Sequence, residues 1–199
     1  IDVRLIRITD DPIPEWSDNL VVAEGQFGEI AVSGPVVTKA YFGQSHADAL
    51  AKIRDGDTIW HRIGDIGYRD AEGRLWFCGR KSQRVETERG TLFTDCIEGM
   101  INEHPDVARS ALVGVGSAGR QTPVVVIEPK PGRFPRGSRR HTFTNELLDL
   151  AQSAVNPQST ISNRQLAIGN WQSAWILFHR SLPVDVRHNA KINREALAR

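Results

Sequence analysis

The chain has 199 residues, of which 40% are hydrophobic and 25% charged, enough for one ordinary domain or two small ones with packed cores. The formal net charge is +1, with acids and bases mixed along most of the chain, which argues against nucleic acid as a partner. No apolar run approaches the ~20 residues that cross a bilayer, so we expect no transmembrane segment. Cys78 and Cys96 match no metal or redox spacing, so we expect no metal ligands and a reduced, cytoplasmic location.

Residues 1–78 have the pattern of a β-rich segment. Residues 3–8 and 28–34 are rich in β-branched side chains and predict strands, separated by a proline-containing break at 10–14. A short helix is expected over 46–53. Two paired strands are expected over 58–69 and 74–87, joined by a tight turn that begins with Asp70 and ends with Gly73.

From residue 79 to residue 199 helical and strand patterns alternate. Thr94 is expected to cap a helix whose apolar face carries Ile97 and Ile101. Pro105 follows that helix. The remaining predicted elements are strands at 111–115 and 124–128, an arginine-rich loop at 129–141, a helix over 147–154, a buried final strand at 175–178, and a short helix near Asn193. The fold class is therefore α+β, with a hinge near Gly79.

Three sequence motifs occur in a fixed order. The first is His-Arg-Ile-Gly-Asp-Ile-Gly-Tyr at 61–68, the second is Leu-Trp-Phe-Cys-Gly-Arg-Lys at 75–81, and the third is Leu-Pro at 182–183 followed by Arg-His-Asn-Ala-Lys-Ile-Asn-Arg at 187–194. A Gly-Glu-Ile at 28–30 precedes them. Together they resemble the adenylate-forming superfamily of acyl-CoA synthetases, peptide-synthetase adenylation domains and luciferases. The resemblance implies that residues 1–78 are the β-rich end of a large AMP-binding domain and 79–199 its mobile C-terminal α+β domain.

The resemblance implies a role in nucleotide binding for two residues. A carboxylate can accept both hydroxyls of a ribose, and the superfamily uses the aspartate at the position of Asp65 in this way. Arg80, at the end of an apolar strand, is expected near the same ribose or phosphate, where a guanidinium supplies rigid forked donors. The alternative for each residue is an ordinary solvated side chain.

Lys191 is the candidate catalytic residue that the resemblance implies. When a carboxylate attacks the α-phosphate of ATP, charge builds on the phosphoryl oxygens, and a lysine can neutralise it. Ser82 stands where the superfamily has its hinge residue. Arg187, His188 and Asn189 are expected in the same active-site loop, although a solvated loop is an equal alternative for His188.

The sequence departs from the common superfamily pattern in the region after the hinge. Glu-Thr-Glu-Arg at 86–89 replaces a Lys-x-x-Gly that helps to admit a pantetheine arm, and a glycine follows one place late at Gly90. These departures resemble the olefin-biosynthesis β-lactone synthetases, in which the hydroxyl of a β-hydroxy acid closes onto its own acyl-adenylate. Acyl-CoA synthetases and carrier-protein adenylation domains are the alternatives within the superfamily.

The expected cofactors are ATP and Mg²⁺, and the expected partners are ATP or AMP, a long-chain acyl or β-hydroxy acid, and other enzymes of the same pathway. The phosphate-grasping loop, the adenine site and the magnesium ligand are expected upstream of Ile1, so this chain alone is expected to be inactive. A stand-alone module that uses a ligase-like tail for binding is the alternative that is not an enzyme.

Overall fold

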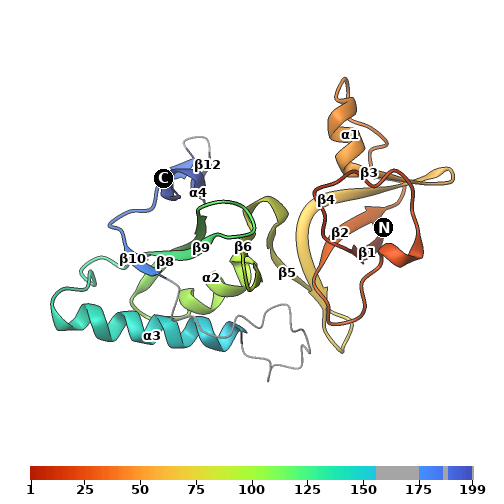
Figure 1. Cartoon of the computed structure of the whole chain (residues 1–199). Helices are drawn as coiled ribbons and strands as arrows, with labels where there is room; N and C mark the ends of the chain where they lie inside the picture. Colours follow the sequence, from red (N-terminus) through yellow and green to blue (C-terminus); the bar gives the residue numbers. More distant parts are fainter. Residues whose placement is uncertain (156–174, 186–187, 199) are drawn as a thin grey trace. The chain divides into compact units, whose positions relative to one another are not determined.

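The computed structural model describes residues 1–155, 175–185 and 188–198, apart from the side chains of 152–155 and 188–190 (Figure 1). Two compact units make up this part of the chain, unit 1 ending at Ser82 and unit 2 beginning at Gln83. The change in sequence pattern lies slightly earlier, between residues 78 and 79. Both units combine helices with sheets, which confirms the α+β class. Among the described residues, no helix is long and apolar enough to cross a membrane.

A five-stranded antiparallel sheet forms the body of unit 1. Its longest strand, β4, pairs with β2, β3 and β5, and β1 pairs with β2. The elements of unit 1 are β1 (Asp2–Ile6), η1 (Asp18–Leu20), β2 (Gly28–Ser33), α1 (Ser45–Ala51), β3 (Lys52–Asp55), β4 (Thr58–Arg69) and β5 (Leu75–Arg80), followed by the 3-10 turn η2 (Lys81–Gln83). Because one strand carries three pairings, β4 fixes the positions of all its neighbours.

The core of unit 1 lies between the sheet and the loop that follows β1. Ile6, Ile53 and Ala31 are fully buried there. Trp16, from the loop, stacks on Trp60 of β4 with ring centroids 4.5 Å apart. Offset aromatic pairs of this kind add stability beyond the area that they bury. The loop with its prolines is therefore part of the packed unit.

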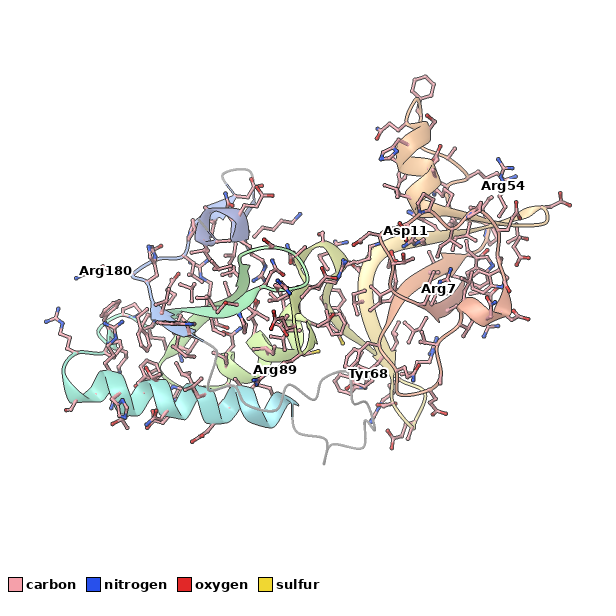
Figure 2. The ribbon with its side chains drawn as sticks, viewed as in Figure 1. Arg7, Asp11, Arg54, Tyr68, Arg89 and Arg180 are labelled. Carbon is pink, nitrogen blue, oxygen red and sulfur yellow. The ribbon has the colours of Figure 1, made fainter. Side chains whose placement is uncertain are left out.

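A buried ion pair crosses the middle of unit 1. Glu29 on β2 and Arg62 on β4 are each 1% exposed, and Nη2 of Arg62 donates to Oε2 of Glu29 over 2.7 Å. Nε of Arg62 donates to the same oxygen, and the remaining guanidinium hydrogens go to the backbone carbonyls of Thr9, Asp11 and Leu50. Asp11 lies in the loop beyond β1 (Figure 2). All five donors of the guanidinium are thus satisfied, as burial requires.

Unit 2 is built on a three-stranded sheet with the order β10-β9-β8. β8 and β9 are antiparallel, whereas β10 joins β9 in parallel after the long helix α3. The elements of unit 2 are β6 (Val85–Thr87), β7 (Gly90–Leu92), α2 (Thr94–Asn102), β8 (Val107–Val115), β9 (Thr122–Pro129), α3 (Ser138–Val155), β10 (Trp175–Phe178), β11 (Val184–Asp185), β12 (His188–Ile192) and α4 (Arg194–Leu197).

The two faces of the unit 2 sheet are covered by different elements. Figure 1 shows α2 and α3 along one side, where Phe143 and Leu147 of α3 are buried. On the other side Ala111 and Val113 pack with Leu182, and Ile192 and Leu197 from the C-terminal segment join this cluster. The alternation of neighbouring strand residues between two packed faces explains the apolar runs in β8 and β9.

Several predicted elements differ from the structure. The strand expected over 74–87 is wrong, because η2 interrupts it after Arg80. The helix expected to reach residue 53 ends at Ala51, since Lys52 already belongs to β3 and pairs with His61 of β4. Thr94 is the first helical residue, and the cap is Phe93 without a side-chain hydrogen bond. β10 is not buried, because it lies at the edge of the sheet and Trp175 is 63% exposed.

The buried pair of Glu29 and Arg62 predicts a large loss of stability on truncation. Arg62→Met should lower the free energy of unfolding by about 3 kcal/mol, because a buried carboxylate loses a counter-ion and backbone carbonyls lose their donors. Urea denaturation followed by tryptophan fluorescence measures this change. Arg7→Met, an exposed arginine of the same unit (Figure 2), is the matched control and should change stability by no more than about 0.5 kcal/mol. Equal effects of the two substitutions would contradict the prediction.

Candidate functional site

Asp65 lies within an irregularity in β4. Ala31 of β2 pairs with Arg62, but Glu29 pairs with Ile66, so β4 carries extra residues opposite β2. Gly64 lies within this bulge and has φ of 75°, a left-handed conformation that glycine adopts without a steric penalty. Bulges change the direction of the side chains that follow them. The glycine in the Gly-Asp motif is therefore required by the backbone that orients Asp65.

The second glycine of this motif, Gly67, is required for a different reason, the close approach of β5. A Cβ atom at Gly67 would lie 2.6 Å from the backbone oxygen of Trp76, so no larger residue fits without moving β5. The next residue, Tyr68, stacks on Trp76 at 6.4 Å and meets Phe27 edge-on at 5.4 Å (Figure 2). The close approach and the aromatic contacts hold β4 and β5 together beside Asp65.

Asp65 and Arg80 are direct neighbours across β4 and β5. Their Cα atoms are register partners, and Nη1 of Arg80 lies 2.7 Å from Oδ1 of Asp65. The carboxylate side chain is 19% exposed and the guanidinium side chain 55% exposed. The structure therefore brings together the two residues expected to bind a nucleotide. The arrangement offers carboxylate acceptors and guanidinium donors to the same ligand.

The turn that joins β4 to β5 is held by Asp70. Its Oδ1 accepts from the backbone N–H groups of Glu72 and Arg74, while Oδ2 accepts from Nε of Arg74 at 2.6 Å and from Nε1 of Trp76 at 2.7 Å. Burial alone would raise its pKa, but the hydrogen bonds from Trp76 and Arg74 lower the pKa of Asp70 to about 2. This turn closes the hairpin that carries Asp65 and Arg80.

Ser82 is the last residue of unit 1, and its side chain is exposed. The preceding residue, Lys81, donates to the buried carboxylate of Glu29 over 3.1 Å and to the carbonyl of Thr9 over 3.0 Å. The chain is therefore anchored immediately before Ser82. An exposed residue next to an anchored one is suited to a change of backbone direction.

Lys191 lies in unit 2 on the small antiparallel pair β11–β12. Val184 pairs with Ile192 and Asp185 with His188. Lys191 is exposed, whereas its neighbour Ile192 packs into the apolar cluster on the sheet. This alternation points the lysine away from the core. Of the other residues expected here, residue 187 lies outside the described part of the chain, and the side chains of His188 and Asn189 do too.

The segment around Lys191 is fastened on both sides. Before it, Leu182 is buried and its N–H donates to Oε2 of Glu128 on β9 over 2.7 Å. After it, the N–H of Asn193 donates to the carbonyl of Pro183, and the Asn193 side chain caps α4 by accepting from Ala196. The short helix predicted near Asn193 is confirmed, with asparagine as a preferred capping residue.

Sequence patterns missed an interaction next to this segment. Arg194 makes a two-bond ion pair with Glu98 on α2, with distances of 2.5 and 2.9 Å. Burial raises the pKa of Glu98, and the charge and hydrogen bonds of Arg194 oppose the rise. The only signal in the sequence is that Glu98 stands next to Ile97 on the apolar side of a predicted helix, where a carboxylate needs a partner.

The segment that departs from the superfamily pattern forms the β6–β7 hairpin. Thr87 pairs with Gly90 and its hydroxyl donates to the Gly90 carbonyl, so Glu88 and Arg89 form the turn (Figure 2). Gln121 joins the hairpin to the sheet, because its backbone N–H and its side-chain oxygen bind the carbonyl and the N–H of Glu86, each over 2.8 Å. The late glycine is thus part of a short, fixed hairpin.

Other candidate features lie away from these residues. The loop predicted over 129–141 is wrong in its last part, because α3 begins at Ser138 and includes Arg139. Arg133 and Arg139 both form ion pairs with Asp106. A cleft of about 540 Å³ in unit 1 is lined by residues that include Lys39, Lys52 and Asp48 but neither Asp65 nor Arg80. In the part of the chain that the structure describes, no group of three or more His, Cys, Asp or Glu residues could hold a metal ion.

Comparison with solved structures identifies the fold. The o-succinylbenzoate CoA synthetase of Bacillus subtilis, solved with an acyl-adenylate intermediate, aligns with a TM-score of 0.66 and 21% identity. The alignment covers 98% of this chain and 33% of that enzyme. At this identity the similarity concerns the fold, which is therefore that of adenylate-forming ligases. No protein-family model matches the chain.

Sequence comparison gives nearer relatives. An olefin β-lactone synthetase of Stenotrophomonas maltophilia is 46% identical over 202 residues, covering 99% of this chain and 34% of the relative. One from Xanthomonas campestris is 45% identical over 205 residues, with the same coverage of 99% and 34%. The chain is homologous to these olefin β-lactone synthetases along nearly its whole length. It spans about a third of the length of these relatives.

The depressed pKa of Asp70 predicts a pH dependence of the β4–β5 hairpin. A carboxyl whose pKa is lower in the folded state stabilises that state above its unfolded pKa of about 3.9, and this contribution disappears as the pH falls toward 2. NMR titration of the Asp70 carboxyl carbon should therefore give a midpoint near 2. In Trp76→Phe, which removes one of the donors, the midpoint should move upward. A midpoint at the ordinary aspartate value in the unmodified protein would contradict this assignment.

Proposed function

We propose that this chain is the C-terminal part of an ATP-dependent acyl-acid ligase that activates a β-hydroxy acid as its acyl-adenylate and closes it to a β-lactone in olefin biosynthesis. The observation that carries the proposal is the pairing of Asp65 with Arg80 in a chain homologous to olefin β-lactone synthetases. In this proposal residues 1–82 complete the large AMP-binding domain, and unit 2 is its mobile C-terminal domain.

Asp65 and Arg80 are proposed to bind the ribose of ATP. The Asp65 carboxylate accepts from the ribose hydroxyls, and the half-exposed Arg80 guanidinium donates to the same hydroxyls or to a phosphate. The existing ion pair supports this role, because it holds both groups in place before the ligand arrives. Preorganised donors and acceptors lose little conformational freedom on binding.

Lys191 is proposed to act in the adenylation step. The substrate carboxylate attacks the α-phosphorus, the bond to pyrophosphate breaks, and negative charge grows on the phosphoryl oxygens. An ammonium group placed there stabilises the transition state more than the bound substrate. Lys191 suits this role because it is exposed on a short, anchored strand.

Ser82 is proposed as the pivot between the two catalytic steps. Asp65 belongs to unit 1 and Lys191 to unit 2, and the division between the units falls directly after Ser82. A rotation at this residue lets Lys191 serve adenylation and leave before the second step. Arg187, His188 and Asn189 are proposed to move with it as part of the same loop.

The acceptor in the second step is proposed to be the substrate's own hydroxyl. Its oxygen attacks the acyl carbon, the bond to AMP breaks, and the hydroxyl proton passes to the released AMP or to water, so that a four-membered lactone forms. The hairpin at 86–90 supports this, because it replaces the glycine that admits a pantetheine arm in thioester-forming relatives. Thioester formation with coenzyme A is the second candidate, because a CoA synthetase has a similar fold.

ATP with Mg²⁺, a long-chain acyl or β-hydroxy acid and other enzymes of the same pathway are the proposed partners, in the cytoplasm. Asp65, Arg80 and Lys191 have the chemistry to hold the ribose and phosphates of the nucleotide. When bound, magnesium neutralises phosphate charge. Its ligand is proposed to lie outside this chain.

The reaction itself is the first test. The full-length enzyme, incubated with ATP and a long-chain β-hydroxy acid without coenzyme A, should release pyrophosphate and AMP and form a β-lactone, identified by mass spectrometry and NMR. The same acid without its β-hydroxyl is the matched control and should give an adenylate but no lactone. A requirement for coenzyme A would show that the second candidate is correct.

The ribose role predicts a loss of nucleotide affinity. In the full-length enzyme, Asp65→Ala should weaken ATP binding by roughly 1.5–3 kcal/mol, because charge-assisted hydrogen bonds to the ribose are lost. Arg80→Ala should act in the same direction. Isothermal titration with a non-hydrolysable ATP analogue measures both. Unchanged affinity in both variants would exclude this site.

The role of Lys191 predicts an effect confined to one half-reaction. Lys191→Ala in the full-length enzyme should lower the rate of pyrophosphate release about 10²–10³-fold and change KM much less, because the charge acts in the transition state. Turnover of supplied acyl-adenylate should stay near normal. Lys130→Ala, in the loop after β9, is a suitable surface control. Near-normal pyrophosphate release by Lys191→Ala would refute the assignment.

A further inference from the structure

The ion pair of Arg194 with Glu98 lies between two parts of unit 2 that are distant in sequence. Arg194 comes three positions after Lys191, and its Nη1 and Nη2 donate to the two carboxylate oxygens of Glu98. The side chains are 17% and 10% exposed. A fork-to-fork pair with this little exposure fixes orientation as well as distance.

The same pair supplies hydrogen-bond partners to the backbone at the edge of the sheet. β8 is an edge strand, so some of its backbone groups have no strand partner. The N–H of Leu112 donates to Oε1 of Glu98 over 2.7 Å, and the Leu112 carbonyl accepts from Nη1 of Arg194 over 3.2 Å. Both side chains are thereby held by rigid backbone and by each other. The pair is therefore held in one position within unit 2.

Arg194 has one further contact, at the start of the unit. Its Nε donates to the side-chain oxygen of Gln83 over 3.2 Å. Gln83 is the first residue of unit 2 and directly follows Ser82. One guanidinium therefore contacts the residue after the proposed pivot, the buried carboxylate of α2, and the carbonyl of Leu112 on the edge strand β8.

We infer that Arg194 is a positioning residue that joins the Lys191 segment to Gln83, so that a rotation at Ser82 carries Lys191 with it as one rigid body. This inference rests on the proposed roles of Lys191 and Ser82. Without the link, Lys191 keeps its charge and its strand, but the strand is no longer fixed to the residue that turns. Small misplacement of a catalytic group costs rate in the step that needs it.

The test uses the full-length enzyme and separates the two half-reactions. Arg194→Met should lower pyrophosphate release about 10–100-fold with little change in KM for ATP, and leave turnover of supplied acyl-adenylate near normal. The double variant Lys191→Ala/Arg194→Met should be no slower than Lys191→Ala alone, since Arg194 acts through Lys191. An effect of Arg194→Met that adds fully to that of Lys191→Ala overturns the inference.

A second variant guards against a general loss of folding. Gln83→Ala removes the link to the pivot but leaves the pair of Arg194 with Glu98 intact, and it should slow pyrophosphate release several-fold at an unchanged melting temperature. Arg139→Met breaks an ion pair with Asp106 elsewhere in unit 2 and should leave both half-reactions unchanged. Normal pyrophosphate release by Gln83→Ala, or by a folded Arg194→Met, overturns the inference.

The outcomes also separate this inference from the function on which it rests. If Lys191→Ala itself adenylates normally, the proposed role of Lys191 fails and the inference fails with it. If Lys191→Ala is slow but Arg194→Met and Gln83→Ala are not, only the positioning role fails. Arg194→Lys gives a graded check, because an ammonium keeps the charge but lacks the planar fork. It should recover stability more fully than it recovers the rate of pyrophosphate release.

Discussion

The burial of one negative charge, the carboxylate of Glu29, organises unit 1. A carboxylate without water is tolerated only with partners, and here Arg62 and Lys81 supply them from β4 and from the turn after β5. Arg62 in turn gathers backbone carbonyls from the loop after β1 and from α1. Lys81 stands between Arg80 and Ser82. The charge therefore fixes the strand end that carries Arg80, which is proposed to bind the nucleotide, and the point from which the chain leaves the unit.

Unit 2 also contains a nearly buried carboxylate that is paired with a basic side chain. Glu98 is nearly buried on α2, and Arg194 comes to it from the C-terminal segment. In both units a buried carboxylate holds a basic residue next to a proposed functional one: Lys81 beside Arg80, and Arg194 near Lys191. Such pairs add less to net stability than their Coulomb energy suggests, but they define one geometry well. That property suits the proposed enzyme, in which small shifts of single groups would change the rate.

The sequence predicts the parts of this structure that depend on neighbouring residues. The motif around Asp65 is found in the sequence, although the bulge at Gly64 and the close backbone approach at Gly67 are seen only in the structure. The short helix near Asn193 is predicted from the sequence. The link between Glu98 and Arg194 is not, because 96 positions separate the two residues and only the fold brings them together. The short β3 and the turn η2 were missed because pairing with β4 and the anchoring of Lys81 decide them, and neither is a local preference.

The contact between Gln83 and Arg194 also bears on how unit 2 is made. It closes a loop of 111 positions, so the first and last parts of the unit meet only when nearly all of it has been synthesised. Loop closure over such a length is entropically costly and is gained late. During translation β6–β9 can form their local pairings first. The hydrogen bond from Arg194 to the Leu112 carbonyl at the edge of β8 can form only later. Until that arginine leaves the ribosome, Glu98 lacks its counter-ion and the Leu112 carbonyl lacks its Arg194 donor. Exposed sheet edges in incompletely folded chains are prone to non-native pairing.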